Sequence, residues 1–228
     1  MKRLVLFDID GTLLTTNGQA IKAMMAAYRD VYGCNAVEFP YRMDGKTELQ
    51  ITHELLALGG LTRAQVQSRL PVFWPHYAEA LDRYLTPETT TEHPGVAELI
   101  QKVAADPDTV LGLLTGNCEA AAQKKLKCAR LDGFVVGAYG DRHERRDELP
   151  LVAVQAAERV TGRRFGGKEI VILGDTPNDV ECGRALGVKA IGVATGRYKL
   201  DELAQYAPDA VFPTFADVSA VLRAINVS

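Results

Sequence analysis

The stretch Leu4-Val5-Leu6-Phe7-Asp8-Ile9-Asp10-Gly11-Thr12, close to the N-terminus, decides the fold. Four apolar residues followed by a carboxylate predict a buried strand that ends at Asp8, because continuous apolar runs are typical of strands covered on both faces. Since strand side chains alternate, Asp8 and Asp10 are predicted to project to one side while Ile9 faces away. Carboxylates so close repel each other unless a cation or a proton lies between them, and Gly11 permits a tight turn. The stretch therefore favours a functional acidic turn over a loop that merely caps the next helix.

Short apolar runs and helix-length segments alternate along most of the chain, which is typical of an α/β protein with a parallel sheet. The predicted strands are 4–7, 110–114, 134–136, 170–173, 190–193 and 210–212. The predicted helices are 96–104, 119–127, 149–161, 180–186 and 215–225. The pattern predicts a Rossmann-like, open parallel sheet with helices on its faces.

Residues 15–86 have a different pattern, with apolar side chains at helical spacing, as at Ile21, Met24 and Tyr28, and no convincing strand. About 70 residues exceed a simple crossover between parallel strands. We therefore expect a core formed by residues 1–14 and 87–228, with an α-helical domain of residues 15–86 inserted after the first strand. The hinges are predicted near residues 15–18 and 86–94.

The composition is that of an ordinary globular protein, with 228 residues, 47% of them hydrophobic, and a net charge of -3. A slightly negative chain has no global basic field that would indicate binding to nucleic acid or anionic lipid. The four cysteines form no CxxC pair, which favours reduced thiols in a cytoplasm, and no stretch approaches the length of a membrane span. We expect a soluble, cytoplasmic protein, and the sequence does not indicate its oligomeric state.

Two further strands are followed by polar residues, and the carboxyl ends of parallel strands are where ligands bind in such sheets. Thr115-Gly116-Asn117 offers a hydroxyl and backbone N–H groups to an anion, or else it caps the helix that begins near Glu119. Asp175 follows the strand 170–173, and Asp179 lies on the opening turn of a helix. Carboxylates there suit Mg²⁺, which prefers oxygen ligands, although they could equally serve as an N-cap and a helix-dipole partner.

A cation is also needed if the site handles phosphate. Arg146, with Arg145 as the alternative, is our candidate because arginine stays protonated and can bind phosphate oxygens with two N–H groups. Lys46, in a loop of the predicted insert, is a candidate for contact with the substrate.

Together these motifs resemble the haloacid dehalogenase-like hydrolase superfamily. DxDGT matches at Asp8 to Thr12, the hydroxyl motif at Thr115, and GDTxxD at Gly174 to Asp179, in the expected order over nearly the whole chain. Residues 183–192 continue as in phosphoglycolate phosphatase-like members, and the insert is similar to a C1 cap. One departure is that the lysine-proline pair usual at the third motif is absent, although arginine replaces the lysine in some branches.

The resemblance implies a magnesium-dependent phosphatase in which Asp8 is the nucleophile and Asp10 is the acid and base, with an aspartyl-phosphate intermediate. It implies Mg²⁺ ligands from Asp8, the Asp10 backbone carbonyl and Asp175, with Asp179 orienting the ligands or the cation. Thr115 and Arg146 would bind phosphoryl oxygens. The remaining candidates for substrate binding are Thr12, Gly116, Asn117 and Lys46.

The expected substrate is a small phosphorylated metabolite, with phosphoglycolate or a sugar phosphate suggested by the resemblance. A dehalogenase is disfavoured because it needs neither Asp10 nor a metal, and a phosphonate hydrolase would need a distinguished cap lysine. A phosphomutase shares every core motif and stays open as an alternative. A non-catalytic phosphoryl-binding module is the alternative from another class, but receiver domains are about half this length and lack DxDGT.

Overall fold

A computed structural model describes residues 2–34 and 41–227. Its centre is a six-stranded parallel sheet with the strand order β5-β4-β1-β6-β7-β8. The strands are β1 (Arg3–Phe7), β4 (Thr109–Leu114), β5 (Val136–Ala138), β6 (Ile170–Gly174), β7 (Lys189–Val193) and β8 (Ala210–Phe212). The predicted Rossmann-like parallel sheet is confirmed. Within it β1 has a central position, between β4 and β6.

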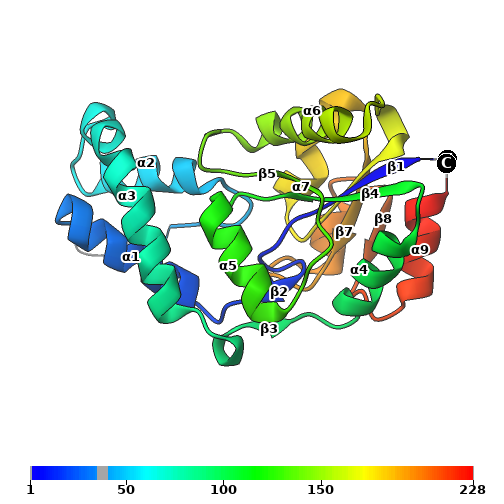
Figure 1. Ribbon diagram of the computed structural model, residues 1–228, viewed down its shortest axis with the longest axis horizontal. Coiled ribbons are helices and arrows are strands. Elements are labelled where there is room, and N and C mark those ends of the chain that lie inside the picture. The colour runs from blue at the N-terminus through cyan, green and yellow to red at the C-terminus, as the bar shows by residue number, and fades with distance from the viewer. Residues whose placement is uncertain (1, 35–40, 228) are drawn as a thin grey trace.

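Helices cover both faces of this sheet, as Figure 1 shows for α6 on one face and for α4 and α9 on the other. The covering helices are α4 (Val96–Ala105), α5 (Glu119–Ala129), α6 (Leu149–Thr161), α7 (Pro177–Cys182), α8 (Leu200–Ala204) and α9 (Val218–Asn226). Alternation along β1 divides the core between them: Val5 and Phe7 pack with α4 and α9, whereas Leu4 and Leu6 pack with α6. All four side chains are fully buried, so β1 is anchored from both sides.

Three predicted elements have shifted boundaries. The strand expected at 134–136 pairs instead at Val136–Ala138, where neighbouring β4 supplies the ladder and overrides the poor strand propensity of Gly137. The helix expected at 180–186 begins at Pro177 and ends at Cys182, with a separate 3-10 turn at Arg184–Leu186. The helix expected at 215–225 begins at Val218 because the Asp217 side chain caps it, accepting from the Ala220 N–H at 2.9 Å.

Three helices between β1 and β4 form what we call the helical segment: α1 (Gln19–Tyr32), α2 (Glu48–Leu58) and α3 (Arg63–Tyr84). These helices lie at the end of the molecule opposite the C-terminus, and α5 lies between them and the strands of the sheet (Figure 1). Their core contains an aromatic cluster in which Phe73 stacks on Tyr28 and Tyr77. Cys118 and Ala121, at the start of α5, belong to the same apolar cluster.

A two-stranded antiparallel ribbon joins the two chain crossings between the sheet and the helical segment. It consists of β2 (Leu14–Thr15) and β3 (Thr91–Glu92), at the predicted hinges, and the sequence analysis missed both strands. Residues 35–40 of the predicted insert lie outside the described residues. Within residues 2–34 and 41–227, none of the helices combines the length and apolar character that crossing a membrane requires.

Candidate active site

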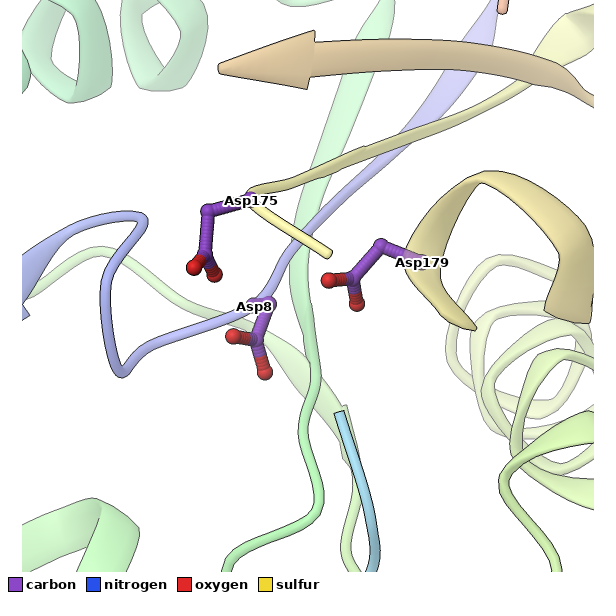
Figure 2. Close-up of side chains that lie close together, drawn as sticks. All are labelled: Asp8, Asp175 and Asp179. Atoms are coloured by element: carbon purple, nitrogen blue, oxygen red, sulfur yellow. The ribbon is translucent and has the colours of Figure 1, made fainter. Parts of the chain in front are cut away.

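Three buried carboxylates converge where β1 and β6 end. Asp8 directly follows β1, Asp175 directly follows β6, and Asp179 lies on α7. One oxygen from each lies within 4.8 Å of the others, and Figure 2 shows the three side chains close together, with Asp175 and Asp179 extending toward Asp8. Adjacent parallel strands end at the same edge of a sheet, so the strand order β1-β6 brings together residues that are 167 positions apart.

Threonine hydroxyls orient two of these carboxylates. The Thr12 hydroxyl donates to Asp175 Oδ1 at 3.1 Å, and the Thr176 hydroxyl donates to Asp179 Oδ2 at 2.6 Å. Thr176, not Asp175, is the N-cap of α7, and the backbone N–H of Thr176 also donates to Asp179 Oδ2, at 3.0 Å. Thr12 is fully buried, so its contact in the structure is with Asp175, and its predicted role in substrate binding stays a prediction.

The guanidinium of Arg146 connects two of the carboxylates. Arg146 is buried, and its Nη2 donates to Asp8 Oδ1 at 2.9 Å and also to Asp179 Oδ1. Its buried Nε has no hydrogen-bond partner among residues 2–34 and 41–227, so the side chain keeps capacity for a further acceptor. Arg145, the alternative candidate, is exposed and pairs with Asp147. Arg146, our first candidate, is therefore the arginine that lies beside the carboxylates.

Burial dominates the protonation of this cluster. It raises the pKa of Asp8 to about 7, with the Asp179 and Asp10 carboxylates adding to the effect and Arg146 opposing it. Burial, together with the Asp179 and Asp8 carboxylates, raises the pKa of Asp175 well above its usual value. Burial opposes the charge on Arg146, but Asp179 and Asp8 outweigh it and raise the pKa of the guanidinium. A second cation in the cluster would lower the pKa values of Asp8 and Asp175 and so favour the ionised form of both carboxyl groups.

Asp10 faces a different cation, Lys125 of α5. The Lys125 ammonium donates to Asp10 Oδ1 at 2.8 Å and to Oδ2 at 2.6 Å, and it also contacts Asn117 Oδ1. The Asn117 amide donates to Asp10 Oδ2 at 2.7 Å. The Lys125 side chain is 3% exposed, whereas that of Asp10 is 46% exposed, so a buried lysine supports a carboxylate that reaches the solvent-accessible part of the site.

Sequence analysis missed Lys125, although one signal was available. The helix 119–127 was predicted, and Ala121, Lys125 and Cys128 lie on one of its faces at spacings of four and three residues. Ala121 and Cys128 are small or apolar and are buried. A lysine on an otherwise buried helix face needs a partner, since lysine is almost never fully buried unless paired.

Thr115 and Asn117 do not cap α5, because its N-cap is Cys118, whose sulfur accepts from the Ala121 N–H at 3.4 Å. The fully buried Thr115 Oγ1 accepts from the Asn117 side chain at 2.7 Å and from the Asn117 backbone at 3.3 Å. Gly116 and Asn117 line the cavity above the carboxylates. The structure thus brings this segment to the site, with Thr115 behind Asn117.

Glu48, at the start of α2, is a second residue that the sequence analysis missed. Its carboxylate is buried, and it accepts from the Cys118 backbone N–H and the Tyr77 hydroxyl, both at 2.8 Å. Burial raises the pKa of Glu48, while the charge of nearby Lys125 opposes this. A carboxylate from the helical segment therefore meets the N-terminus of α5, where exposed backbone N–H groups favour negative charge.

Backbone contacts hold the helical segment against the sheet. The Glu48 N–H donates to Gly116 O at 2.7 Å, and the Leu49 N–H donates to Gly140 O at 2.9 Å. A Cβ atom at Gly116 would lie 2.0 Å from Lys46 O, a distance that real Cβ atoms do not reach. Glycine at position 116 is therefore required for this close approach of the two backbones.

A cavity of about 330 Å³ lies between the helical segment and the sheet, and Asp8, Asp10, Asp175 and Arg146 line it. Lys46 also lines the cavity, but its ammonium binds Glu54 at 2.5 Å and the Tyr41 hydroxyl at 3.2 Å. The cavity gives the cluster access to a small molecule, and one side of the enclosure comes from the helical segment.

A family model of haloacid dehalogenase-like hydrolases matches residues 2–187 of the chain. The chain belongs to this hydrolase family. The predicted resemblance and the prediction of an enzyme are therefore confirmed.

A probable phosphatase, IndB of Dickeya dadantii, is 27% identical, with 99% of this chain and 95% of the relative covered. The pyrophosphatase PpaX of Listeria welshimeri is 25% identical over 96% of this chain and 95% of the relative. These relatives place the hydrolase among phosphatases of the family.

Solved structures agree on the fold. A β-phosphoglucomutase from Clostridium difficile superposes with a TM-score of 0.73 at 14% identity and covers 99% of this chain and 98% of its own. A hydrolase from Pseudomonas syringae superposes with a TM-score of 0.71 at 20% identity, with full coverage of both chains. At these identities the likeness concerns the fold alone.

Proposed function

We propose that this family member is a magnesium-dependent phosphatase that hydrolyses a small phosphate monoester through an aspartyl-phosphate on Asp8. The convergence of Asp8, Asp175 and Asp179 around a buried arginine, at the base of a small-molecule cavity, carries the proposal. A pure binding module would need only cations for phosphate. Acidic side chains beside the phosphate site add repulsion that a binder does not need, but they supply a nucleophile and metal ligands.

The residues present fit Mg²⁺, a cation that prefers carboxylate and carbonyl oxygens. Asp8 and Asp175 would be side-chain ligands, and the Asp10 backbone carbonyl would be a third. Both oxygens of Asp179 already accept hydrogen bonds, from Arg146 and Thr176, which supports an orienting role for this residue. The raised pKa values of Asp8 and Asp175 support this fit, because a divalent cation between the two carboxyl groups would favour their ionised forms. When bound, Mg²⁺ would offset the repulsion between these carboxylates and the phosphate.

In the proposed first step, an Asp8 carboxylate oxygen attacks phosphorus in line and the bond to the leaving oxygen breaks. Asp10 gives a proton to that oxygen. In the second step Asp10 accepts a proton from water while the water oxygen attacks phosphorus, so that the bond between phosphorus and the Asp8 oxygen breaks and inorganic phosphate leaves. Arg146, with its unpartnered Nε, and the hydroxyl of Thr115 would bind the phosphoryl oxygens, while Asn117 and Lys125 hold Asp10.

Asp10 supports phosphate transfer over dehalogenation. Its carboxylate is accessible from the cavity and is held by two donors that fix its orientation. Dehalogenation releases halide, which needs no proton, so such a positioned acid would have no task. A phosphomutase stays the alternative with the same core, and it would require a second substrate hydroxyl rather than water as acceptor.

We further propose that residues 15–86 act as a cap whose closure excludes water from the site. The backbone contacts to Gly116 and Gly140 and the position of the cavity between the helical segment and the sheet support this division, with the β2–β3 ribbon at the boundary. The four cysteines are free thiols, which supports a cytoplasmic setting. The proposed ligand is a small phosphorylated metabolite, and we propose no nucleic-acid or membrane partner.

The direct test is release of phosphate from p-nitrophenyl phosphate by the purified protein. We expect steady turnover with Mg²⁺, loss of activity to background with a chelator, and recovery when excess Mg²⁺ is added back. Steady release without a second sugar also separates a phosphatase from a phosphomutase. A single stoichiometric release, or none with any divalent metal, would contradict the proposal and favour the non-catalytic binding module.

Gly116→Ala is expected to lower kcat/KM by on the order of ten- to a hundredfold, because the new Cβ atom would push Lys46 and its neighbours away from the site. The measurement is steady-state hydrolysis of p-nitrophenyl phosphate together with a thermal melt. Gly166→Ala is the matched control, since a Cβ atom there meets nothing within 4 Å. Equal activity of the two variants would show that the close backbone contact does not matter for turnover.

A further inference from the structure

An apolar stretch lies on the cavity wall that belongs to the helical segment, beside the charged side chains of Asp44, Lys46 and Glu48. It is formed by Ala20, Ile21 and Met24 of α1, Met43 of the following loop and Ile51 of α2. Ile21 is 48% exposed, and an exposed large apolar side chain inside a binding cavity indicates contact with a ligand more than a packing role. The opposite wall carries the carboxylates and Arg146. A ligand with a phosphoryl group at the carboxylates would therefore extend its other end towards apolar side chains.

The cations that line this cavity in the described part of the chain already face carboxylates. Arg146 binds Asp8 and Asp179, Lys125 binds Asp10, and Lys46 binds Glu54. The remaining cation, Arg197, lies 3.6 Å from Asp44. A second anionic group on the ligand would compete with these carboxylates for the cations, and it would also meet the negative charge of Asp44 and Glu48, which line the same cavity.

From these two observations we propose that the substrate is a phosphate monoester whose leaving group is uncharged and apolar. This proposal rests on the proposed phosphatase function and narrows its substrate class. It excludes as preferred substrates those with a second anion, such as pyrophosphate or phosphoglycolate. In this respect the chain would differ from its relatives that are named pyrophosphatases.

The test is a series of n-alkyl phosphates from methyl to butyl, compared with pyrophosphate and 2-phosphoglycolate, with Mg²⁺ present. The alkyl compounds carry the same charge and have leaving groups of nearly the same basicity, so apolar contact is the main variable. Each CH₂ group buried in the cavity is expected to raise kcat/KM up to about fourfold. We expect kcat/KM to rise at least about tenfold from methyl to butyl phosphate. The kcat/KM values for pyrophosphate and 2-phosphoglycolate, which carry a second anionic group, should be lower than that for butyl phosphate.

Ile21→Lys is the variant that should reverse the preference for an apolar leaving group. A lysine at this exposed position adds an uncommitted cation to the apolar wall, so the ratio of kcat/KM for butyl phosphate to that for 2-phosphoglycolate is expected to fall at least about tenfold. Leu58→Lys is the control, because Leu58 is similarly exposed, at 54%, on α2 but is not part of the cavity wall. This variant should keep the wild-type ratio.

The outcomes separate the two proposals. A flat or falling alkyl series, or a higher kcat/KM for pyrophosphate or 2-phosphoglycolate than for butyl phosphate, would overturn the apolar leaving group and leave the phosphatase intact. Equal ratios for Ile21→Lys and Leu58→Lys would also overturn it. Hydrolysis of p-nitrophenyl phosphate but of none of these compounds would likewise overturn the apolar leaving group alone, whereas failure with p-nitrophenyl phosphate as well would overturn the phosphatase function itself.

Discussion

Asp8→Asn is expected to lower phosphate release from p-nitrophenyl phosphate by roughly 10⁴-fold or more, because removal of a covalent nucleophile removes the pathway that it opens. Asparagine has nearly the same shape, and its amide oxygen can still accept the hydrogen bond from Arg146 Nη2. The effect should therefore appear in kcat with the fold intact. The measurement is steady-state hydrolysis with saturating Mg²⁺.

The control for this variant is Asp82→Asn, since the Asp82 side chain on α3 is 71% exposed and pairs with Lys124 of α5. It should keep wild-type turnover. Retained hydrolysis in Asp8→Asn, at more than a few per cent of wild type, would show that another group attacks phosphorus. The assignment of Asp8 as nucleophile would then be wrong.

Asp8→Asn also has a stability signature in the absence of metal. The pKa of Asp8 in the folded protein is about 7, above its ordinary value of 3.8, so between these pH values the folded state binds more protons than the unfolded state. Stability of the wild type should therefore fall as pH rises from about 4 to 7 in chelator. Asparagine does not titrate, so the variant should lose this part of the pH dependence in urea unfolding. An unchanged slope would contradict the raised pKa.

Lys125→Met is expected to lower kcat by roughly a hundred- to a thousandfold, because a misplaced general acid and base forfeits most of its contribution. Methionine fills much of the same volume but leaves Asp10 with Asn117 as its remaining donor. It also removes the cation that faces buried Glu48, so we expect a loss of about 3 kcal/mol in the free energy of unfolding. Both quantities are measurable on the same preparation, by steady-state kinetics and by urea unfolding.

Lys124→Met is the matched control for this variant, one position earlier on α5. Lys124 pairs with the exposed Asp82 rather than with the site, so its loss should change kcat little and stability by less than about 1 kcal/mol. A second variant, Glu48→Gln combined with Lys125→Met, removes both buried charges. It should regain part of the stability but not the activity. Recovery of full activity in the double variant would show that Lys125 does not position Asp10.

The sheet and the carboxylate cluster were predictable because local signals agree with the final structure. The apolar run before Asp8 and that before Asp175 identify two strands, and the parallel pairing of β1 with β6 then brings these residues together. Arg146 was a weaker inference from a charged stretch, yet it is the arginine of that stretch that is buried against Asp8. Gly162 marked the end of α6 correctly, whereas Gly187 follows a separate 3-10 turn and α7 already ends at Cys182.

The missed features depend on contacts between distant parts of the chain. Lys125 is 115 residues from Asp10, and Glu48 is 70 residues from Cys118, so no local pattern pairs them. The β2–β3 ribbon joins two-residue strands, which are too short to show alternation. For Thr12, a hydroxyl in a turn suggested ligand contact, and only the position of Asp175 in space shows which acceptor it meets.

The main-chain contacts at Gly116 and Gly140 have a consequence for divergence. On the side of the helical segment, the Glu48 and Leu49 N–H groups make these contacts, so they do not depend on the side chains of Ile21 or Met43 on the cavity wall. The side chains of Ile21 and Met43 can thus be replaced without changing the contacts between the helical segment and the sheet. A scaffold fastened in this manner can exchange one chemical preference for another by single substitutions, while the reaction centre stays untouched.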